Sequence, residues 1–170
     1  MSHARRGEPR TSDLGGTGYC ACFNTRKAAR ALTQLYDAAL RPSALRATQF
    51  AILVAVAKTQ PVSIGDLGEV TVIDRTTLTR SLRLMQRQRL LSVGPWAARR
   101  QRFVRLTRKG WRRLGRGLPL WRKIQGAFVE ELGPRQWGFL QRELERVAGV
   151  ALDLEESRSL GRSPPAPRRS

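Results

Sequence analysis

The amino-acid sequence predicts a mainly α-helical protein with one small β-hairpin. Apolar residues recur at helical spacing through most of the region between residues 20 and 152. One pair of short segments, 90–93 and 101–106, instead has the composition of strands around a turn. The length of 170 residues, 41% of them hydrophobic, suits one domain with a real core.

The first half of the folded region is expected to contain four helices, over residues 20–40, 47–59, 64–69 and 75–89. Pro42 ends the first helix, and the second ends before Pro61. Ser63 is a suitable N-terminal cap for the short third helix, and Asp74 is one for the fourth. A helix, a short helix and a helix with tight connections have the layout of a helix-turn-helix.

The second half begins with the hairpin and continues with two long helices. A β-hairpin directly after a helix-turn-helix is a wing, so the segments predict a winged helix-turn-helix. Thr107 can cap the next helix, and Pro134 suits the first position of the last one. The expected helices are 108–131 and 134–152, the folded domain is 19–153, and disordered polar tails are expected over 1–18 and 154–170.

Positive charge is concentrated in the middle of the chain. Lys and Arg number 32 against 13 Asp and Glu, which gives a net charge of +19. Residues 75–123 alone hold 16 basic side chains and no acidic one. A folded segment tolerates such repulsion when it binds a polyanion or spreads the charge over a solvated face. DNA or RNA is the favoured partner, and an acidic membrane surface is the alternative.

Several classes of protein are excluded by composition. No run approaches the roughly 20 apolar residues of a membrane span, and no secretory signal is visible, so a cytoplasmic location without a membrane partner is expected. The only histidine, His3, cannot supply a catalytic triad or most zinc sites. Paired carboxylates and a glycine-rich phosphate loop are also lacking. We therefore expect no enzyme, no metal and no cofactor.

Four segments together resemble a known family: Gln49–Leu53, Ser63–Leu67, Asp74–Arg80 and Val104–Gly110. They are similar to the MarR family of winged-helix transcription regulators, over about residues 20–150. The resemblance implies an obligate homodimer on a pseudo-palindromic operator in double-stranded DNA. It also implies a DNA-binding lobe at about 47–107 and a helical dimerisation region made of about 20–40 and 108–152.

This sequence departs from the family pattern at two places. The wing of the family carries Asp-x-Arg, and the matching residues here are Ala98 and Arg100, so the bracing carboxylate is lost. The family ends its recognition helix with Gly, where this chain has Arg89. A left-handed conformation costs a non-glycine residue roughly 1 kcal/mol, so we expect this cap to form differently.

The first turns of the helix that starts after Asp74 are expected to enter the major groove. Arg75 and Arg80 are long enough to reach guanine edges or the backbone, and the neighbouring threonines can bond phosphates or bases. Arginines at the hairpin tip can enter a narrow minor groove. A solvated helix start and a solvated turn are the alternatives. The candidate DNA-binding residues are Ser63, Asp74, Arg75, Thr76, Thr77, Thr79, Arg80, Arg99, Arg100 and Arg102.

The cysteines suggest a second site. Cys22 followed by Phe23 resembles the first helix of the OhrR-type organic hydroperoxide sensors, in which Cys22 would be the sensor and Tyr36 a hydrogen-bonding tyrosine. The other tyrosine falls on Arg26, whose charge favours a reactive thiolate. Alternatively, Cys20 and Cys22 are small buried residues at the dimer seam.

The favoured function is that of a homodimeric, sequence-specific regulator, a repressor released by a small aromatic or peroxide effector or by cysteine oxidation. The alternative is an architectural DNA- or RNA-binding protein without sequence preference, which the same basic block would serve.

Overall fold

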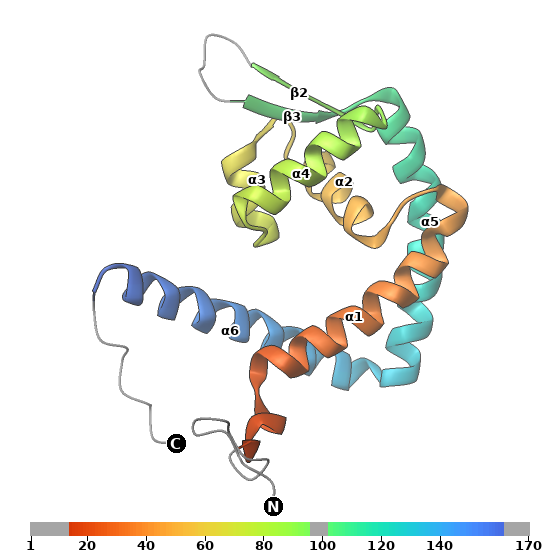
Figure 1. Ribbon diagram of the computed structural model, residues 1–170. Helices are drawn as coiled ribbons and strands as arrows, with labels where there is room; N and C mark the ends of the chain where they lie inside the picture. The colour runs from red at the N-terminus through yellow and green to blue at the C-terminus, as the bar shows by residue number, and fades with distance from the viewer. Residues whose placement is uncertain (1–13, 96–101, 162–170) are drawn as a thin grey trace, which may run out of the picture. The chain divides into compact units, whose positions relative to one another are not determined.

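The computed structural model describes residues 14–95 and 102–161. It confirms a mainly helical winged-helix fold with a small antiparallel sheet (Figure 1). In chain order, the elements are η2 (Thr17–Tyr19), α1 (Ala21–Leu40), η3 (Arg41–Ser43), α2 (Ala47–Thr59), β1 (Val62–Ser63), α3 (Ile64–Thr71), α4 (Arg75–Arg87), β2 (Leu91–Pro95), β3 (Arg102–Leu106), α5 (Arg108–Leu132) and α6 (Pro134–Ser159).

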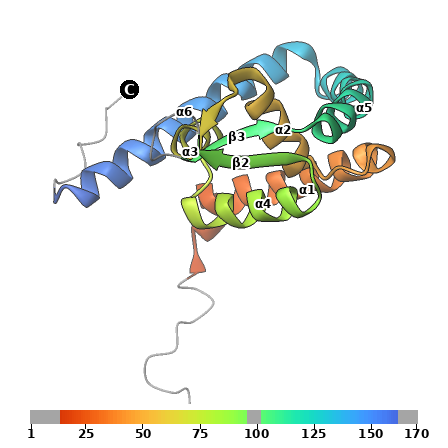
Figure 2. The same cartoon turned by 90° about the horizontal axis from the view of Figure 1, so that it is seen from above.

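The chain forms two compact units, one reaching to Arg122 and the other beginning at Lys123. The first unit holds a continuous apolar core, in which α4 lies beside β2 and α2 beside β3 (Figure 2). Every one of these elements contributes side chains to that core. Its most deeply buried members include Leu40, Ile52, Leu53, Val56, Leu67, Leu78, Leu82, Met85 and Val104.

The sheet has three strands in the order β1-β3-β2, all antiparallel. In the hairpin, Val93 pairs with Val104, so that buried Val104 points into the core. The short strand β1 adds Val62 opposite Val104 on the other edge. A strand of only two residues is too short to show an alternating pattern of apolar and polar side chains, so β1 could not be predicted from the sequence.

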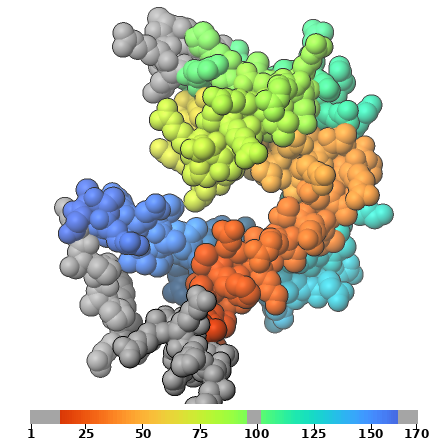
Figure 3. Space-filling view, viewed as in Figure 1, coloured from red at the N-terminus to blue at the C-terminus, as the bar shows by residue number. Residues whose placement is uncertain are grey.

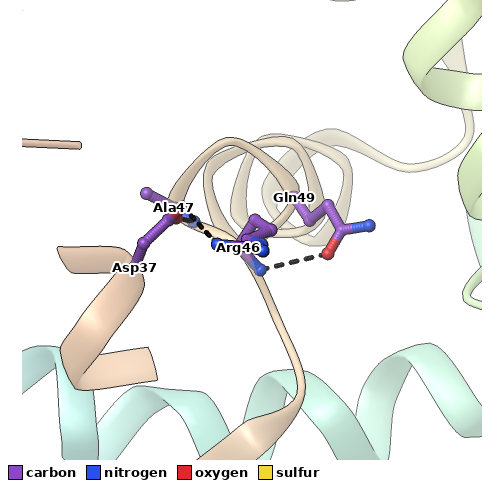
Figure 4. A network of polar contacts seen from close by, with 4 residues as sticks. All are labelled: Asp37, Arg46, Ala47 and Gln49. Atoms are coloured by element: carbon purple, nitrogen blue, oxygen red, sulfur yellow. Dashed lines mark hydrogen bonds and ion pairs between the residues drawn. The ribbon is translucent and has the colours of Figure 1, made fainter. Parts of the chain in front are cut away.

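A carboxylate near the end of α1 fixes the start of α2 (Figure 4). Asp37 accepts a hydrogen bond from the backbone N–H of Ala47 at 2.6 Å and pairs with Arg46 at 3.0 Å. Gln49 accepts from the backbone N–H of Arg46 and donates to the side chain of Gln88 beyond the end of α4. These contacts therefore connect α1, α2 and the end of α4.

The first half of α5 packs against α2. Gly117 lets the helix approach Phe50 closely, because a Cβ there would lie 3.1 Å from the ring. Trp121 stacks on the same ring with centroids 6.1 Å apart. Leu40 of α1 and Leu114 of α5 are also buried in this core. The lobe predicted at about 47–107 is thus wider, because parts of both flanking helices complete its core.

The last helix is longer than the sequence indicated. It runs to Ser159, so the predicted tail at 154–170 begins too early. Residues 153–159 include no Gly or Pro, and the helix ends just before Gly161, whose φ of +66° favours glycine. At the other end, Pro134 occupies the first turn as expected, and Trp137 packs edge-on against Phe128 at 5.7 Å.

The expected N-terminal tail also requires a correction. Its last residues, Thr17 and Gly18, belong to the short helical turn η2, and the Thr17 hydroxyl donates to the carbonyl of Leu14. Within the two described ranges, no helix is long and apolar enough to cross a membrane.

Candidate nucleic-acid interface

The start of α4 is fixed by Asp74. Its Oδ1 accepts the backbone N–H of Thr77 at 2.9 Å, which satisfies a donor at the helix start. Hydrogen bonds from the Thr77 hydroxyl and backbone N–H hold the pKa of Asp74 below its ordinary value. The inner face of α4 is anchored by Leu78, Leu82 and Met85, all buried. The opposite face is therefore held in a defined orientation.

The outer face of α4 and its flanks carry five of the ten predicted DNA-binding residues. Arg75, Thr76, Thr77 and Arg80 are exposed, and Thr79 is half-buried. The hydroxyl of Thr77 is already used at the Asp74 cap, so Thr76 is the freer of the two neighbours. Figure 3 shows α4 on the outer surface of its unit.

Two further arginines extend this face. Thr76, Arg80, Arg83 and Arg87 follow one another at helical spacings of four, three and four residues, so they share one side of α4. We call them the α4 stripe. Arg83 and Arg87 are both exposed, and the prediction, which stopped at the first turns, omitted them. Their spacing in the sequence could have identified them.

The other predicted DNA-binding residues do not lie on α4. Ser63 is only 7% exposed, and its Oγ accepts the backbone N–H of Asp66. It is a mostly buried helix cap at the edge of a hollow beside α3. Arg102 is exposed at the start of β3 and, with Arg75 and Thr79, lines a hollow of about 700 Å³ beside α3. Arg99 and Arg100, at the wing tip, lie outside the described residues.

The end of α4 corrects another expectation. Arg89 adopts the left-handed conformation itself, with φ +58°. Its backbone N–H donates to the carbonyl of Gln86, and that of Leu90 donates to Met85, which is the pattern of a Schellman cap. The cap thus forms as it would with glycine. Thr107, eighteen residues further along the chain, donates a hydrogen bond to the carbonyl of Arg89.

Thr107 joins this cap to the start of α5. Its hydroxyl lies 2.6 Å from the carbonyl oxygen of Arg89, to which it donates, and accepts the backbone N–H of Gly110 at 3.0 Å. The expected capping of α5 by Thr107 is therefore confirmed. Lys109 donates to the carbonyl of Gln88 at 2.9 Å. The end of α4 and the start of α5 are bonded together at this junction.

The residues of the predicted cysteine site are not all brought together within one chain. Cys20 and Cys22 are both exposed, at the start of α1. Arg26 lies one helical turn after Cys22 and on the same face. Tyr36 lies fourteen residues after Cys22 in the same helix, which at about 1.5 Å per residue separates them by about 21 Å. Tyr36 therefore cannot contact the sulfur of Cys22 in its own chain.

No group of three or more potential metal ligands is present among the residues that the structure describes.

Residues 44–100 match the model of the MarR family. The transcriptional regulator MosR of M. tuberculosis, in a crystal structure with DNA, is 37% identical, with a TM-score of 0.73 over 79% of this chain and 98% of MosR. The chain belongs to the MarR family. As a member of this family, it is a DNA-binding transcription regulator and not an enzyme.

More distant MarR-type structures share the fold. A single-site mutant of MarR from E. coli, complexed with operator DNA, is 18% identical with a TM-score of 0.68, covering 82% of this chain and 99% of that one. PcaV of Streptomyces coelicolor, in complex with its natural ligand, is 21% identical with a TM-score of 0.71, covering 84% and 99%. No curated protein sequence matches the chain.

Proposed function

We propose that this MarR-family protein is a homodimeric repressor that reads a pseudo-palindromic operator with α4. The observation that carries the proposal is the α4 stripe, which presents one threonine and three arginines on the side opposite a buried anchor. A helix held in this way can enter a major groove, where arginine can bond guanine. The similarity to MosR, whose structure contains DNA, supports this assignment.

The apolar surface of α6 supports a homodimer. This helix has 26 residues, and none of them is buried. A helix with so much exposed apolar surface gains stability by covering it, and a second copy of the chain is the expected cover. The exposed apolar residues are Phe139, Leu140, Leu144, Val147, Val150, Leu152 and Leu154.

Release from DNA is proposed to follow binding of a small ligand or oxidation of Cys22. Exposed Cys22 near the helix start, with Arg26 one turn away, is accessible to a peroxide. If Tyr36 takes part, a second subunit must supply it, because of the distance along α1. PcaV, which is crystallised with its natural ligand, supports a small-molecule effector as the other route.

Selection of bound fragments from genomic DNA tests the proposal. A palindromic consensus with half-sites about one helical turn apart is expected from two-fold symmetry. Affinity for the selected duplex is then compared with affinity for random DNA. A ratio near one would contradict the proposal and favour the non-specific architectural alternative.

Single substitutions then test the assigned helix. Arg80→Ala should reduce affinity for the selected duplex by roughly 1–3 kcal/mol, the value of a good base contact. Lys58→Ala, which removes an equal charge from an exposed position near the end of α2, is the matched control. Equal losses in the two variants, measured by fluorescence anisotropy, would remove α4 from the recognition surface.

The oxidation route needs its own measurement. Treatment with cumene hydroperoxide should lower the affinity of the unaltered protein and leave that of Cys22→Ser unchanged. Cys20→Ser shows whether the neighbouring thiol is needed. Unchanged affinity of the unaltered protein after complete thiol oxidation would leave ligand binding as the only route.

A further inference from the structure

A second group of cations lies outside the recognition helix, on the first half of α5. Lys109, Arg112, Arg113 and Arg116 together line an open hollow of about 260 Å³. We call these four residues the α5 cluster. They recur at spacings of three and four residues, so they form one face of α5, while Gly110, Leu114 and Gly117 are buried on another.

The four side chains of the cluster fall into two pairs, one bonded to backbone carbonyls and one not. Arg113 donates to the carbonyl of Ser43 at 2.9 Å, and Lys109 to that of Gln88 at 2.9 Å, so backbone contacts hold these two side chains in place. Arg112 and Arg116 are exposed and make no hydrogen bond or ion pair with any described residue. Lys109 and Arg113 are therefore held in place, and the neighbouring Arg112 and Arg116 have N–H donors available for a ligand.

No carboxylate offsets this charge. No acidic residue lines the hollow, and none occurs anywhere in residues 75–123. Four cations crowded on one helix repel one another, and this repulsion is relieved when an anion binds between them. Arginine guanidinium groups match the geometry of phosphate oxygens, with two parallel hydrogen bonds from one side chain.

We propose that the α5 cluster binds a phosphate group, with Arg112 and Arg116 as its direct donors and Lys109 and Arg113 adding fixed positive charge. The cluster continues from the α4 stripe, since Lys109 bonds to the residue that follows Arg87. This continuity favours the backbone of DNA beyond the half-site as the source of the phosphate. A free phosphate ester has the same chemistry and is the other source to be tested.

The double variant Arg112→Ala/Arg116→Ala tests the site in the full-length protein. Arg122→Ala/Lys123→Ala is the matched control, because it removes the same charge from exposed positions farther along α5. Both pairs are on the surface, and circular dichroism melting checks that each variant folds. Arg112→Lys/Arg116→Lys, which keeps the charge but loses the paired donors, should retain part of the binding.

The DNA arm measures affinity against salt concentration on two duplexes, one just covering the selected operator and one longer by about ten base pairs, or one helical turn, at each end. Each phosphate contact contributes about 0.9 to the slope of log affinity against log salt. On the longer duplex, the double variant should lose up to about 2 units of slope per subunit, while the control keeps the slope of the unaltered protein.

The free-anion arm measures binding of inorganic pyrophosphate by calorimetry without DNA. A tenfold or greater loss in the double variant, with an unchanged DNA slope, assigns the site to a free phosphate group instead of the DNA backbone. If the double variant matches its control in both arms, the proposal is overturned. That result leaves the proposed function standing. Absence of specific DNA binding by the unaltered protein, in contrast, overturns the proposed function, and the pyrophosphate measurement alone then tests the phosphate site on α5.

Discussion

Gly110 lies directly against the backbone carbonyl of Leu90, so closely that a Cβ built on Gly110 would overlap the carbonyl oxygen. Leu90 closes the Schellman cap of α4, and Gly110 belongs to the first turn of α5. The end of α4 and the start of α5 are thus in backbone contact. This contact and the hydrogen bonds of Thr107 fix the two helix ends against each other.

Gly110→Ala should lower the free energy of unfolding by roughly 1–3 kcal/mol, since neither backbone can yield without disturbing a helix end. Urea unfolding followed by circular dichroism measures the change. The control is Gly115→Ala in the same helix, where a Cβ meets nothing within 4 Å. That substitution should stabilise the protein by roughly 0.5–1 kcal/mol, and a loss similar to that of Gly110→Ala would contradict the close contact.

Arg89→Gly should stabilise the protein by roughly 1 kcal/mol, because the left-handed conformation of Arg89 is costly for a residue with a Cβ. Thermal melting in parallel with Arg87→Gly provides the comparison. Arg87 is still within α4, where glycine is expected to cost roughly 0.5–1 kcal/mol. Destabilisation by both substitutions would show that contacts of the Arg89 side chain stabilise the fold by more than its left-handed backbone conformation costs.

Asp37→Ala should cost about 1 kcal/mol of stability, which is typical for loss of a helix cap. Asp37→Asn keeps an oxygen that can accept the backbone N–H of Ala47 but loses the ion pair with Arg46. Because that arginine is 74% exposed, the pair is expected to contribute little. Chemical denaturation should therefore show a clearly smaller loss for Asn than for Ala, and equal losses would assign the effect to the ion pair.

Asp74 should make stability depend on acid pH. Its pKa is lowered in the folded protein from an ordinary value of 3.8, so its contribution is present above that pH and is lost as the pH falls through the lowered pKa. Asp74→Asn lacks this titration. The difference in unfolding free energy between the two proteins should narrow as the pH falls below 3.8, whereas a constant difference would indicate that Asp74 titrates normally.

Several functional features could be predicted because they depend on residues close together in the chain. The cap of α4 by Asp74 involves a neighbour three residues away, and the amphipathic period of α4 identifies its buried face. Arg83 and Arg87 follow the same period and were within reach of the same reasoning. Ser63 was correctly identified as a cap, but its burial depends on the packing of β1 and α3 within the lobe.

The amino-acid sequence by itself determined the helix-turn-helix, the hairpin and the concentration of positive charge, since helix period, capping and composition are local properties. Tertiary structure alone decided that Arg89 would take a glycine conformation, that β1 would add a third strand, and that Leu40 and Leu114 would complete the core of the lobe. Each of these outcomes depends on contacts between residues far apart in the chain, and the free energy of such contacts outweighs local preference only once the chain is folded.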